Sequence, residues 1–298
     1  MLKEFLYSAK WFFDVRICRK NKPLQTVLFI TDLCNLNCLH CHVYNAQNPT
    51  MKSMKQIEEE MRYSYQLGSR FIDLEGGEPL LWRDGEADIN DVIDLAKQIG
   101  FFSTTVTTNA QLPFDNLRAD SIWVSLDGIN SFHDEVRGAG AFAKLEENIA
   151  NCKHKHVNAN MVINSRNYEN VEETIKYVKE HLNLTSISLN FHTPFPGTEA
   201  LFLPWKLRKE VIEKIIQLKR NGYPIMNSLS GLKMMRENNF DKVCWICNFI
   251  LADGMRLPEC PGSKMNVCNE CGFCMAGEMK SVYNLKADTI IAGLKLRL

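Results

Sequence analysis

The sequence lacks any apolar run approaching the roughly 20 residues that a membrane-spanning helix needs. It also lacks an excess of either charge, since 35 Lys and Arg residues balance 35 Asp and Glu residues. Nothing in this balance indicates a nucleic-acid partner. Charged residues, Lys3 and Asp14 among them, interrupt the first fifteen positions, which is untypical of a signal peptide. We therefore expect a cytoplasmic protein that does not bind nucleic acid.

Cysteine, in contrast, is abundant. The chain has eleven cysteines, and nine of them fall into two clusters. In a reducing compartment, clustered cysteines indicate metal sites rather than disulfides. Cys18 and Cys152 lie outside both clusters, and we expect them to be ordinary thiols.

From residue 25 onward, the chain alternates between two patterns. Runs rich in β-branched and aromatic residues predict strands at 25–31, 70–75, 103–108, 121–126, 157–163 and 186–192. Helical periodicity predicts helices at 54–68, 89–99, 141–152, 168–183 and 206–221. Six such units predict an α/β fold with a parallel sheet, namely an open, partial (β/α)6 TIM-like barrel. Functional residues of such folds gather at the carboxyl ends of the strands.

The two ends of the chain differ from this barrel region. Residues 1–24 carry six Lys and Arg residues, with apolar residues at close to helical spacing. This pattern predicts an amphipathic helix that either packs on the barrel or lies on a membrane surface. We assign 25–225 to the barrel and 226–298 to a small cysteine-rich extension stabilised by metal.

The first cysteine cluster directly follows the first predicted strand. Cys34, Cys38 and Cys41 have the spacing C-x3-C-x2-C, which lets one loop wrap around one inorganic cluster. Thiolates are soft ligands that suit iron–sulfur clusters or zinc. Three protein ligands leave one position open for chemistry. The alternative is a structural zinc knuckle in which His42 is the fourth ligand.

The segment CNLNCLHC resembles the signature loop of the radical S-adenosylmethionine (SAM) superfamily, with His40 in the position usually held by an aromatic residue. The resemblance implies that Cys34, Cys38 and Cys41 bind a [4Fe–4S] cluster. It also implies that the amine and carboxylate of SAM chelate the open iron. One electron would then cleave SAM and yield a 5′-deoxyadenosyl radical.

Further motifs follow the next strands in the order typical of this superfamily. The resemblance implies that the turn formed by Gly76, Gly77, Glu78 and Pro79 holds the amino group of SAM. It also makes Ser125 and Asp127 candidates for binding the ribose and methionyl parts. Short polar residues at other strand ends are further candidates for the pocket, namely Thr107, Thr108, Asn109 and the weaker Asn164. His133 and Arg137 resemble superfamily residues near a helix start, with surface residues as the alternative. His192 and Glu199 follow the sixth strand near the same mouth of the sheet, and His192 could act on the substrate.

The second cluster comprises Cys244, Cys247, Cys260, Cys268, Cys271 and Cys274. Asp253-Gly254, between two apolar runs, predicts a hairpin framed by cysteines. This arrangement resembles the SPASM or twitch extensions of radical SAM enzymes, although it has shorter final spacings and six cysteines rather than seven. We expect one auxiliary [4Fe–4S] cluster, with a zinc ribbon as the alternative. The sequence does not tell which four thiols bind the metal.

The leading hypothesis is a radical SAM enzyme that receives electrons from a reductant such as flavodoxin or ferredoxin. Its substrate would be a peptide or protein, a lipid or isoprenoid, or a small metabolite. Residues 227–274 more loosely resemble enzymes that add adenosyl to hopanoid-type lipids, and the basic N-terminus allows peripheral contact with a membrane. The alternatives are a non-catalytic iron–sulfur electron carrier and a zinc-binding structural protein.

Overall fold

The computed structural model describes residues 2–41 and 48–297, and the alternative zinc ligand His42 lies outside them. The strands are β1 (Gln25–Phe29), β2 (Phe71–Glu75), β3 (Ser103–Thr108), β4 (Ser121–Ser125), β5 (Val157–Ile163), β6 (Ser186–Phe191), β7 (Cys247–Ile250) and β8 (Arg256–Leu257). The α-helices are α1 (Leu2–Phe12), α2 (Met54–Leu67), α3 (Ile89–Ile99), α4 (Ser131–Arg137), α5 (Ala141–Asn151), α6 (Val171–Glu180), α7 (Trp205–Arg220), α8 (Leu229–Glu237), α9 (Met275–Tyr283) and α10 (Ala287–Arg297).

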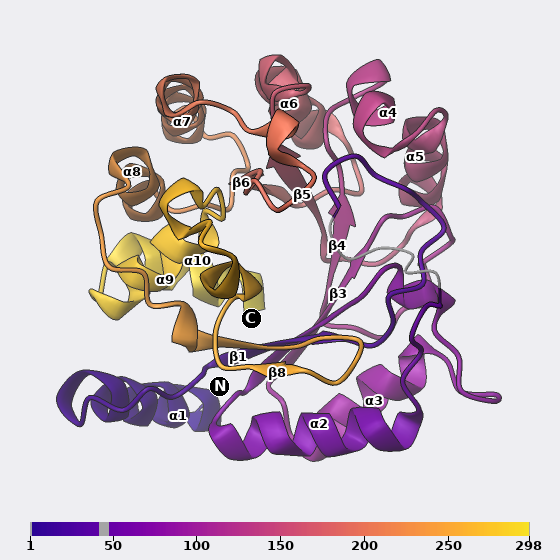
Figure 1. Cartoon of the computed structure of the whole chain (residues 1–298), viewed down its shortest axis with the longest axis vertical. Coiled ribbons are helices and arrows are strands. Elements are labelled where there is room, and N and C mark those ends of the chain that lie inside the picture. Colours follow the sequence, from indigo (N-terminus) through magenta and orange to yellow (C-terminus); the bar gives the residue numbers. More distant parts are fainter. Residues whose placement is uncertain (1, 42–47, 298) are drawn as a thin grey trace.

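The strands form one curved sheet in the order β6-β5-β4-β3-β2-β1-β7-β8. Strands β1 to β6 are parallel to their neighbours, and α2 to α7 lie around the outside of the curve (Figure 1). The predicted α/β partial barrel is therefore confirmed. The six predicted strands and five predicted helices all occur within a few residues of their expected bounds.

Local sequence explains where the barrel helices begin and end. Helix α3 begins at a capping box, in which the Asp88 carboxylate accepts from the backbone N–H of Asn90 and the Asp91 carboxylate accepts from that of Asp88. The helix ends at Gly100. Ser53 caps α2 by accepting from the backbone N–H of Gln56. These caps fix the residues at which the two helices begin or end.

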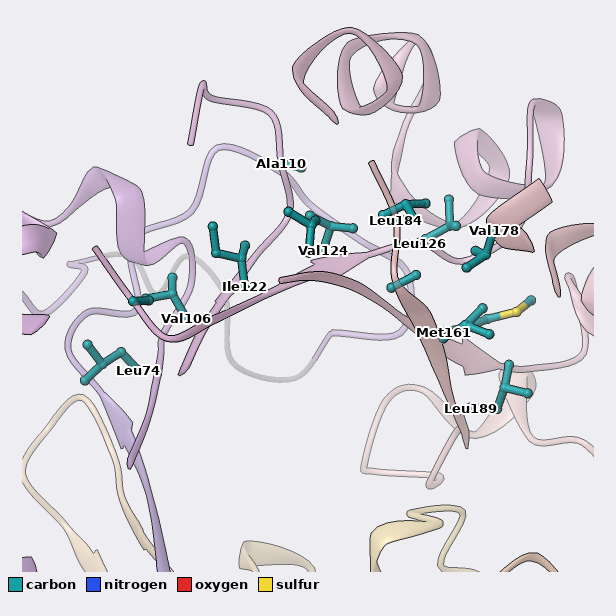
Figure 2. Packing of buried hydrophobic residues seen from close by; sticks show 14 of the residues in the cluster. Leu74, Val106, Ala110, Ile122, Val124, Leu126, Met161, Val178, Leu184 and Leu189 are labelled. Carbon is teal, nitrogen blue, oxygen red and sulfur yellow. The ribbon is translucent and has the colours of Figure 1, made fainter. Parts of the chain in front are cut away.

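The main hydrophobic core lies between the sheet and these outer helices. Along β2, Ile72 and Leu74 are fully buried in this layer, while the alternate residues face the barrel interior. Figure 2 shows apolar side chains from several strands and from α6 that form the layer, among them Leu74, Val106, Ile122, Val124, Met161, Val178 and Leu189. The barrel interior is thus left to a separate set of side chains, many of them polar.

The cysteine-rich region contacts both edges of the partial barrel. Strand β7 pairs in parallel with β1, and β7 and β8 form the hairpin that the Asp-Gly signal predicts. At the opposite edge, the backbone N–H of Phe191 in β6 donates to the carbonyl of Gly272 at 2.7 Å. A Cβ atom at Gly272 would lie 2.1 Å from the Phe191 carbonyl oxygen, so this approach requires glycine. Residues 244–297 therefore bridge the open side of the barrel.

The N-terminal segment forms the predicted helix and packs on this bridging region. Trp11 is fully buried, and together with Val15 it contacts Val243 and Ile246. The indole N–H of Trp11 donates to the carbonyl of Lys22 at 2.9 Å. Among the described helices, none is both long and apolar enough to span a bilayer.

Candidate functional site

A cavity of about 360 Å³ lies at the carboxyl ends of the barrel strands. It brings together residues that the sequence places in separate motifs. Its lining includes Cys34, Cys38, His40, Cys41, Gly76, Gly77, Thr107, Thr108, Asn109, Ser125, Arg137 and His192. Three other candidates, Glu78, Asp127 and Asn164, are fully buried behind this lining.

The cysteine loop is held by donors that face its sulfur atoms. Arg137 Nη1 lies 3.9 Å from Cys38 Sγ, and Asn109 Nδ2 lies 3.7 Å from Cys34 Sγ. Burial, opposed by the nearby Arg137 charge, raises the pKa of the Cys38 thiol to about 11. Electropositive and N–H groups around thiols favour bound thiolate, as a metal site requires.

The two glycines press against the chain just before the cysteine loop. The backbone N–H of Gly77 donates to the carbonyl of Thr31 at 2.8 Å, and Glu78 donates likewise to Leu33. Added Cβ atoms would lie 2.4 Å from the Thr31 oxygen at Gly76 and 2.3 Å from the Leu33 oxygen at Gly77. No side chain fits at either position, so the turn stays close to the cysteine loop.

Glu78 stabilises the floor of the cavity. Its carboxylate accepts from the Thr108 hydroxyl at 2.8 Å, the Asn109 backbone N–H at 2.7 Å and the Leu80 backbone N–H at 3.1 Å. Burial raises its pKa to about 7, although these donors act in the opposite direction. Pro79 is buried at the start of the next short 3-10 helix. The side chain of Glu78 thus joins the ends of β2 and β3.

Asp127 is paired within the protein rather than directed at the cavity. It accepts from Arg137 Nε at 2.7 Å and from the Val162 backbone N–H at 2.7 Å, and His40 Nε2 lies 3.6 Å away. Burial opposes its ionisation, but the Arg137 charge and the Val162 N–H hold its pKa below the usual value. The backbone N–H of Asp127 donates to His133 Nδ1 at 3.2 Å. Asp127 therefore orients Arg137, which reaches the sulfur of Cys38.

The remaining predicted residues divide between the cavity and the surface. His192 lines the cavity, with its Nε2 atom 3.0 Å from the Thr198 hydroxyl oxygen. Glu199 is exposed, accepts from the backbone N–H of Gly197 and is not among the residues that line this cavity. Asn164 accepts from the backbone N–H of Arg166 and thereby shapes the loop after β5.

The sequence analysis did not single out several residues that also line the cavity, among them the polar strand residues Glu75, Asn160 and Asn190. Each lies in a strand and faces the barrel interior. Asn190 Nδ2 donates to Asn160 Oδ1 at 3.0 Å. The sequence does indicate these positions, because polar residues are unusual in strands that are buried on both faces.

Four cysteines of the second cluster lie within electrostatic range of one another. Burial raises the pKa of the Cys244 thiol to about 12, with Cys260, Cys268 and Cys271 adding to the shift. Burial likewise raises the Cys260 pKa to about 11, with further contributions from Cys271 and Cys268.

The other two cysteines of this cluster are placed differently. Cys247 lies in β7 and packs with Val27 and Phe249 in a separate apolar cluster. Cys274 is buried near Cys271, and its backbone N–H donates to Asn190 Oδ1 at 2.9 Å. Both therefore contribute to the barrel wall.

Arg208 links the two cysteine regions. This fully buried side chain donates to the carbonyl of Leu203 at 2.7 Å, of Glu270 at 3.0 Å and of His192 at 2.5 Å. Burial lowers its pKa to about 10, partly offset by the nearby thiols of Cys274 and Cys271. The guanidinium therefore ties the second cluster to the rim of the first cavity.

The donor set fits an iron–sulfur cluster at the first cavity. Three thiols of Cys34, Cys38 and Cys41 border it, and N–H donors face two of them. His40 Nδ1 is buried without a hydrogen-bond partner, and burial lowers the pKa of this imidazole to about 4, so it is neutral and has one nitrogen free for a bound group. Within 2–41 and 48–297, no three His, Cys, Asp or Glu side chains converge closely enough to hold a single metal ion.

Comparisons with known proteins agree with this chemistry. The sequence profile of the Radical SAM superfamily matches residues 28–178. A "Probable GTP 3',8-cyclase" of Sulfolobus acidocaldarius is 26% identical over 185 residues, which are 58% of each chain. An "Fe-coproporphyrin III synthase" of Methanosarcina barkeri is 23% identical over 74% of this chain and 60% of its own. The chain thus spans less than two thirds of the length of these relatives.

A solved structure shares the fold. Streptococcus suis SuiB bound to S-adenosylmethionine superposes with a TM-score of 0.65 and 18% identity, over 87% of this chain and 65% of SuiB. The superfamily profile covers half of the chain, including the cysteine loop and the glycine turn. The protein therefore belongs to the radical SAM superfamily, whose enzymes use a [4Fe–4S] cluster and S-adenosylmethionine.

Proposed function

We propose that this protein reductively cleaves SAM and directs the resulting radical at a substrate held inside the barrel. The observation that carries the proposal is the single cavity lined by the cysteine loop, the glycine turn, Asn109 and Ser125. A [4Fe–4S] cluster held by these cysteines would supply the one electron that reductive cleavage of a carbon–sulfur bond of SAM requires, with methionine and a 5′-deoxyadenosyl radical as the products.

The residues of the chain position the reactants. Cys34, Cys38 and Cys41 ligate the cluster, and Arg137 and Asn109 donate toward their sulfur atoms. The backbone of Gly76 and Gly77 receives the amino group of SAM, with Glu78 and Pro79 fixing the turn from behind.

On the opposite wall, Ser125 binds the polar groups of the nucleoside. Asp127 and Asn164 act indirectly, the first through Arg137 and the second through the loop after β5.

We further propose that Cys244, Cys260, Cys268 and Cys271 ligate an auxiliary [4Fe–4S] cluster. Their mutual proximity supports this choice of four among the six cysteines. We propose that residues 226–298 form the extension that carries this cluster. Its strand β7 pairs with β1 of the barrel.

The substrate classes that the sequence suggests remain proposals. A peptide or protein is favoured by fold similarity to SuiB, which was also solved with its precursor peptide, while a lipid or isoprenoid remains the second candidate. The electron would come from a cytoplasmic flavodoxin or ferredoxin.

A specific surface supports peripheral contact with a membrane. Phe5 and Ile17 are 70% and 68% exposed on the N-terminal helical segment, and exposed Lys10 and Arg16 adjoin them. Apolar residues flanked by cations suit an anionic bilayer surface. Co-sedimentation with anionic vesicles, but not with neutral ones, would support this contact, and Phe5→Ser should weaken it.

The test of the main proposal is anaerobic. The protein is reconstituted with iron and sulfide, mixed with dithionite and SAM, and assayed for 5′-deoxyadenosine, iron and zinc. We expect deoxyadenosine and about eight irons per chain, four for each cluster. Bound zinc with little iron and no deoxyadenosine would contradict the proposal.

A further inference from the structure

A second cavity, of about 260 Å³, lies deeper in the barrel than the cavity at the cysteine loop. We call it the inner chamber. It shares five lining residues with the first cavity, namely Glu75, Thr107, Asn160, Asn190 and Phe273. The two spaces are therefore neighbours, and a molecule in the inner chamber would lie next to SAM bound above it.

The walls of the inner chamber differ in polarity. Val27 of β1, Phe249 of β7 and Met279 of α9 lie on a largely apolar wall, to which α9 also contributes Glu278. The opposite wall comes from β2, β3, β5 and β6 and is polar. Its members are Asp73, Glu75, Thr105, Thr107, Asn160, Ser188 and Asn190. A ligand that satisfies both walls has an apolar body and a hydrogen-bonding group.

The charge of the lining is one-sided. Asp73, Glu75 and Glu278 line the inner chamber, and its lining contains no Lys, Arg or His among the described residues. In the first cavity, Arg137 supplies a lining guanidinium that is already paired with Asp127. Phosphate groups need cationic or clustered N–H donors, and this chamber offers carboxylates instead.

Glu75 occupies the boundary between the two spaces. It ends β2 immediately before Gly76, and the Thr107 hydroxyl donates to its Oε1 atom at 3.3 Å. Asp73 faces the same interior two residues earlier and accepts from the Gln25 amide. A cation that contacts Glu75 would compensate a carboxylate that is otherwise costly to keep ionised away from bulk water.

We propose that the inner chamber binds the substrate and that this substrate is an apolar molecule bearing an amine, which pairs with Glu75. The inference rests on the proposed function and narrows its substrate class. It also separates this chain from its relatives named as GTP 3',8-cyclases, because no Lys, Arg or His of the described part of the chain lines the chamber to receive a triphosphate.

The experiment is anaerobic calorimetry on the reconstituted protein in the presence of SAM. Three probes share one ring and differ in head group: phenethylamine, 2-phenylethanol and 3-phenylpropionate. GTP is the fourth probe. We expect phenethylamine to bind about tenfold more tightly than 2-phenylethanol, and we expect no binding of 3-phenylpropionate or GTP.

Two substitutions test whether Glu75 is the group that selects the amine. Glu75→Gln should weaken phenethylamine binding about tenfold and leave 2-phenylethanol unchanged, since only the charged pair is lost. Glu199→Gln changes the net charge equally at an exposed site and should leave all affinities unchanged. The inference is overturned by failure of phenethylamine to bind, by equal or tighter binding of the anions, or by an amine preference that survives in Glu75→Gln.

Deoxyadenosine formation in the same preparation separates this inference from the proposed function. Deoxyadenosine formation together with anion binding would overturn the substrate class alone. Selective amine binding without deoxyadenosine formation would overturn the proposed function and leave the chamber's preference standing.

Discussion

The two cysteine regions are built in different ways. The first places Cys34, Cys38 and Cys41 in one short loop after β1. The second collects Cys244, Cys260, Cys268 and Cys271 from separate segments around the β7–β8 hairpin. A local loop reveals its chemistry through spacing alone. A site assembled from distant segments shows its ligands only when the fold brings them together.

The largest expected effect concerns the first region. Cys38→Ala should abolish deoxyadenosine formation and remove about four irons per chain, because a loop with two thiols no longer holds its cluster. Iron analysis and chromatography of the products measure both quantities. Cys18→Ala, which changes an exposed thiol outside both regions, is the control. Persistent SAM cleavage by Cys38→Ala protein would show that the site is assigned wrongly.

The next prediction concerns Arg208, which connects the two cysteine regions. Arg208→Ala should lower the free energy of unfolding by about 3 kcal/mol or more, because three buried carbonyl groups lose a charged donor. Denaturant unfolding measures the change. Lys209→Ala, at the exposed neighbouring position, should stay within about 0.5 kcal/mol of the unmodified protein. Similar values for both variants would mean that Arg208 does not link the regions.

A third prediction tests which thiols form the second site. Cys271→Ala should lower the iron content from about eight to about four per chain while the first cluster persists. Cys247→Ala should leave the iron content unchanged, because Cys247 packs in the wall of the barrel. Loss of both clusters in Cys271→Ala would instead show that the second site is needed for the whole fold. Iron loss in Cys247→Ala would refute the proposed set of ligands.

The smallest effects come from buried carboxyl groups near each region. Burial raises the pKa of Glu278 to about 7 from an ordinary value of 4.5. The folded protein then binds more protons than the unfolded chain between these values, so this group lowers stability as the pH rises from 4.5 to 7. Glu278→Gln should therefore stabilise the protein at pH 8 by about 1 kcal/mol, reduced by solvent in the chamber, and by much less at pH 5.

Glu78 is the buried carboxyl group near the first region. Glu78→Gln should destabilise the protein at pH 8, whereas Glu278→Gln should stabilise it. Both carboxylate oxygen atoms of Glu78 accept from N–H or O–H donors, so the amide of Glu78→Gln would oppose one donor and destabilise the protein at pH 8. Thermal unfolding of the two variants at pH 5 and pH 8 measures the difference. The same sign for both at pH 8 would contradict this account.

Much of the fold and part of the site could be predicted from the sequence. Strand and helix periodicity is local, and it gave the six barrel units, while the spacing of three cysteines and the adjacent glycines identified the loop and turn that line the cavity. The role of Glu75 was not visible, because it depends on the direction in which a strand residue faces. The pairing of Asp127 with Arg137 likewise depends on how α4 packs after β4.

The bridging of the barrel by residues 244–297 has a consequence for the order of folding. Strand β1 is synthesised more than two hundred residues before its neighbour β7. Until then β1 presents an unpaired edge with Val27 and Phe29 beside it, a surface that invites pairing with other chains. Such long-range pairing makes folding slow. Newly made chains should therefore depend on chaperones until the cysteine-rich region is complete and the edge is covered.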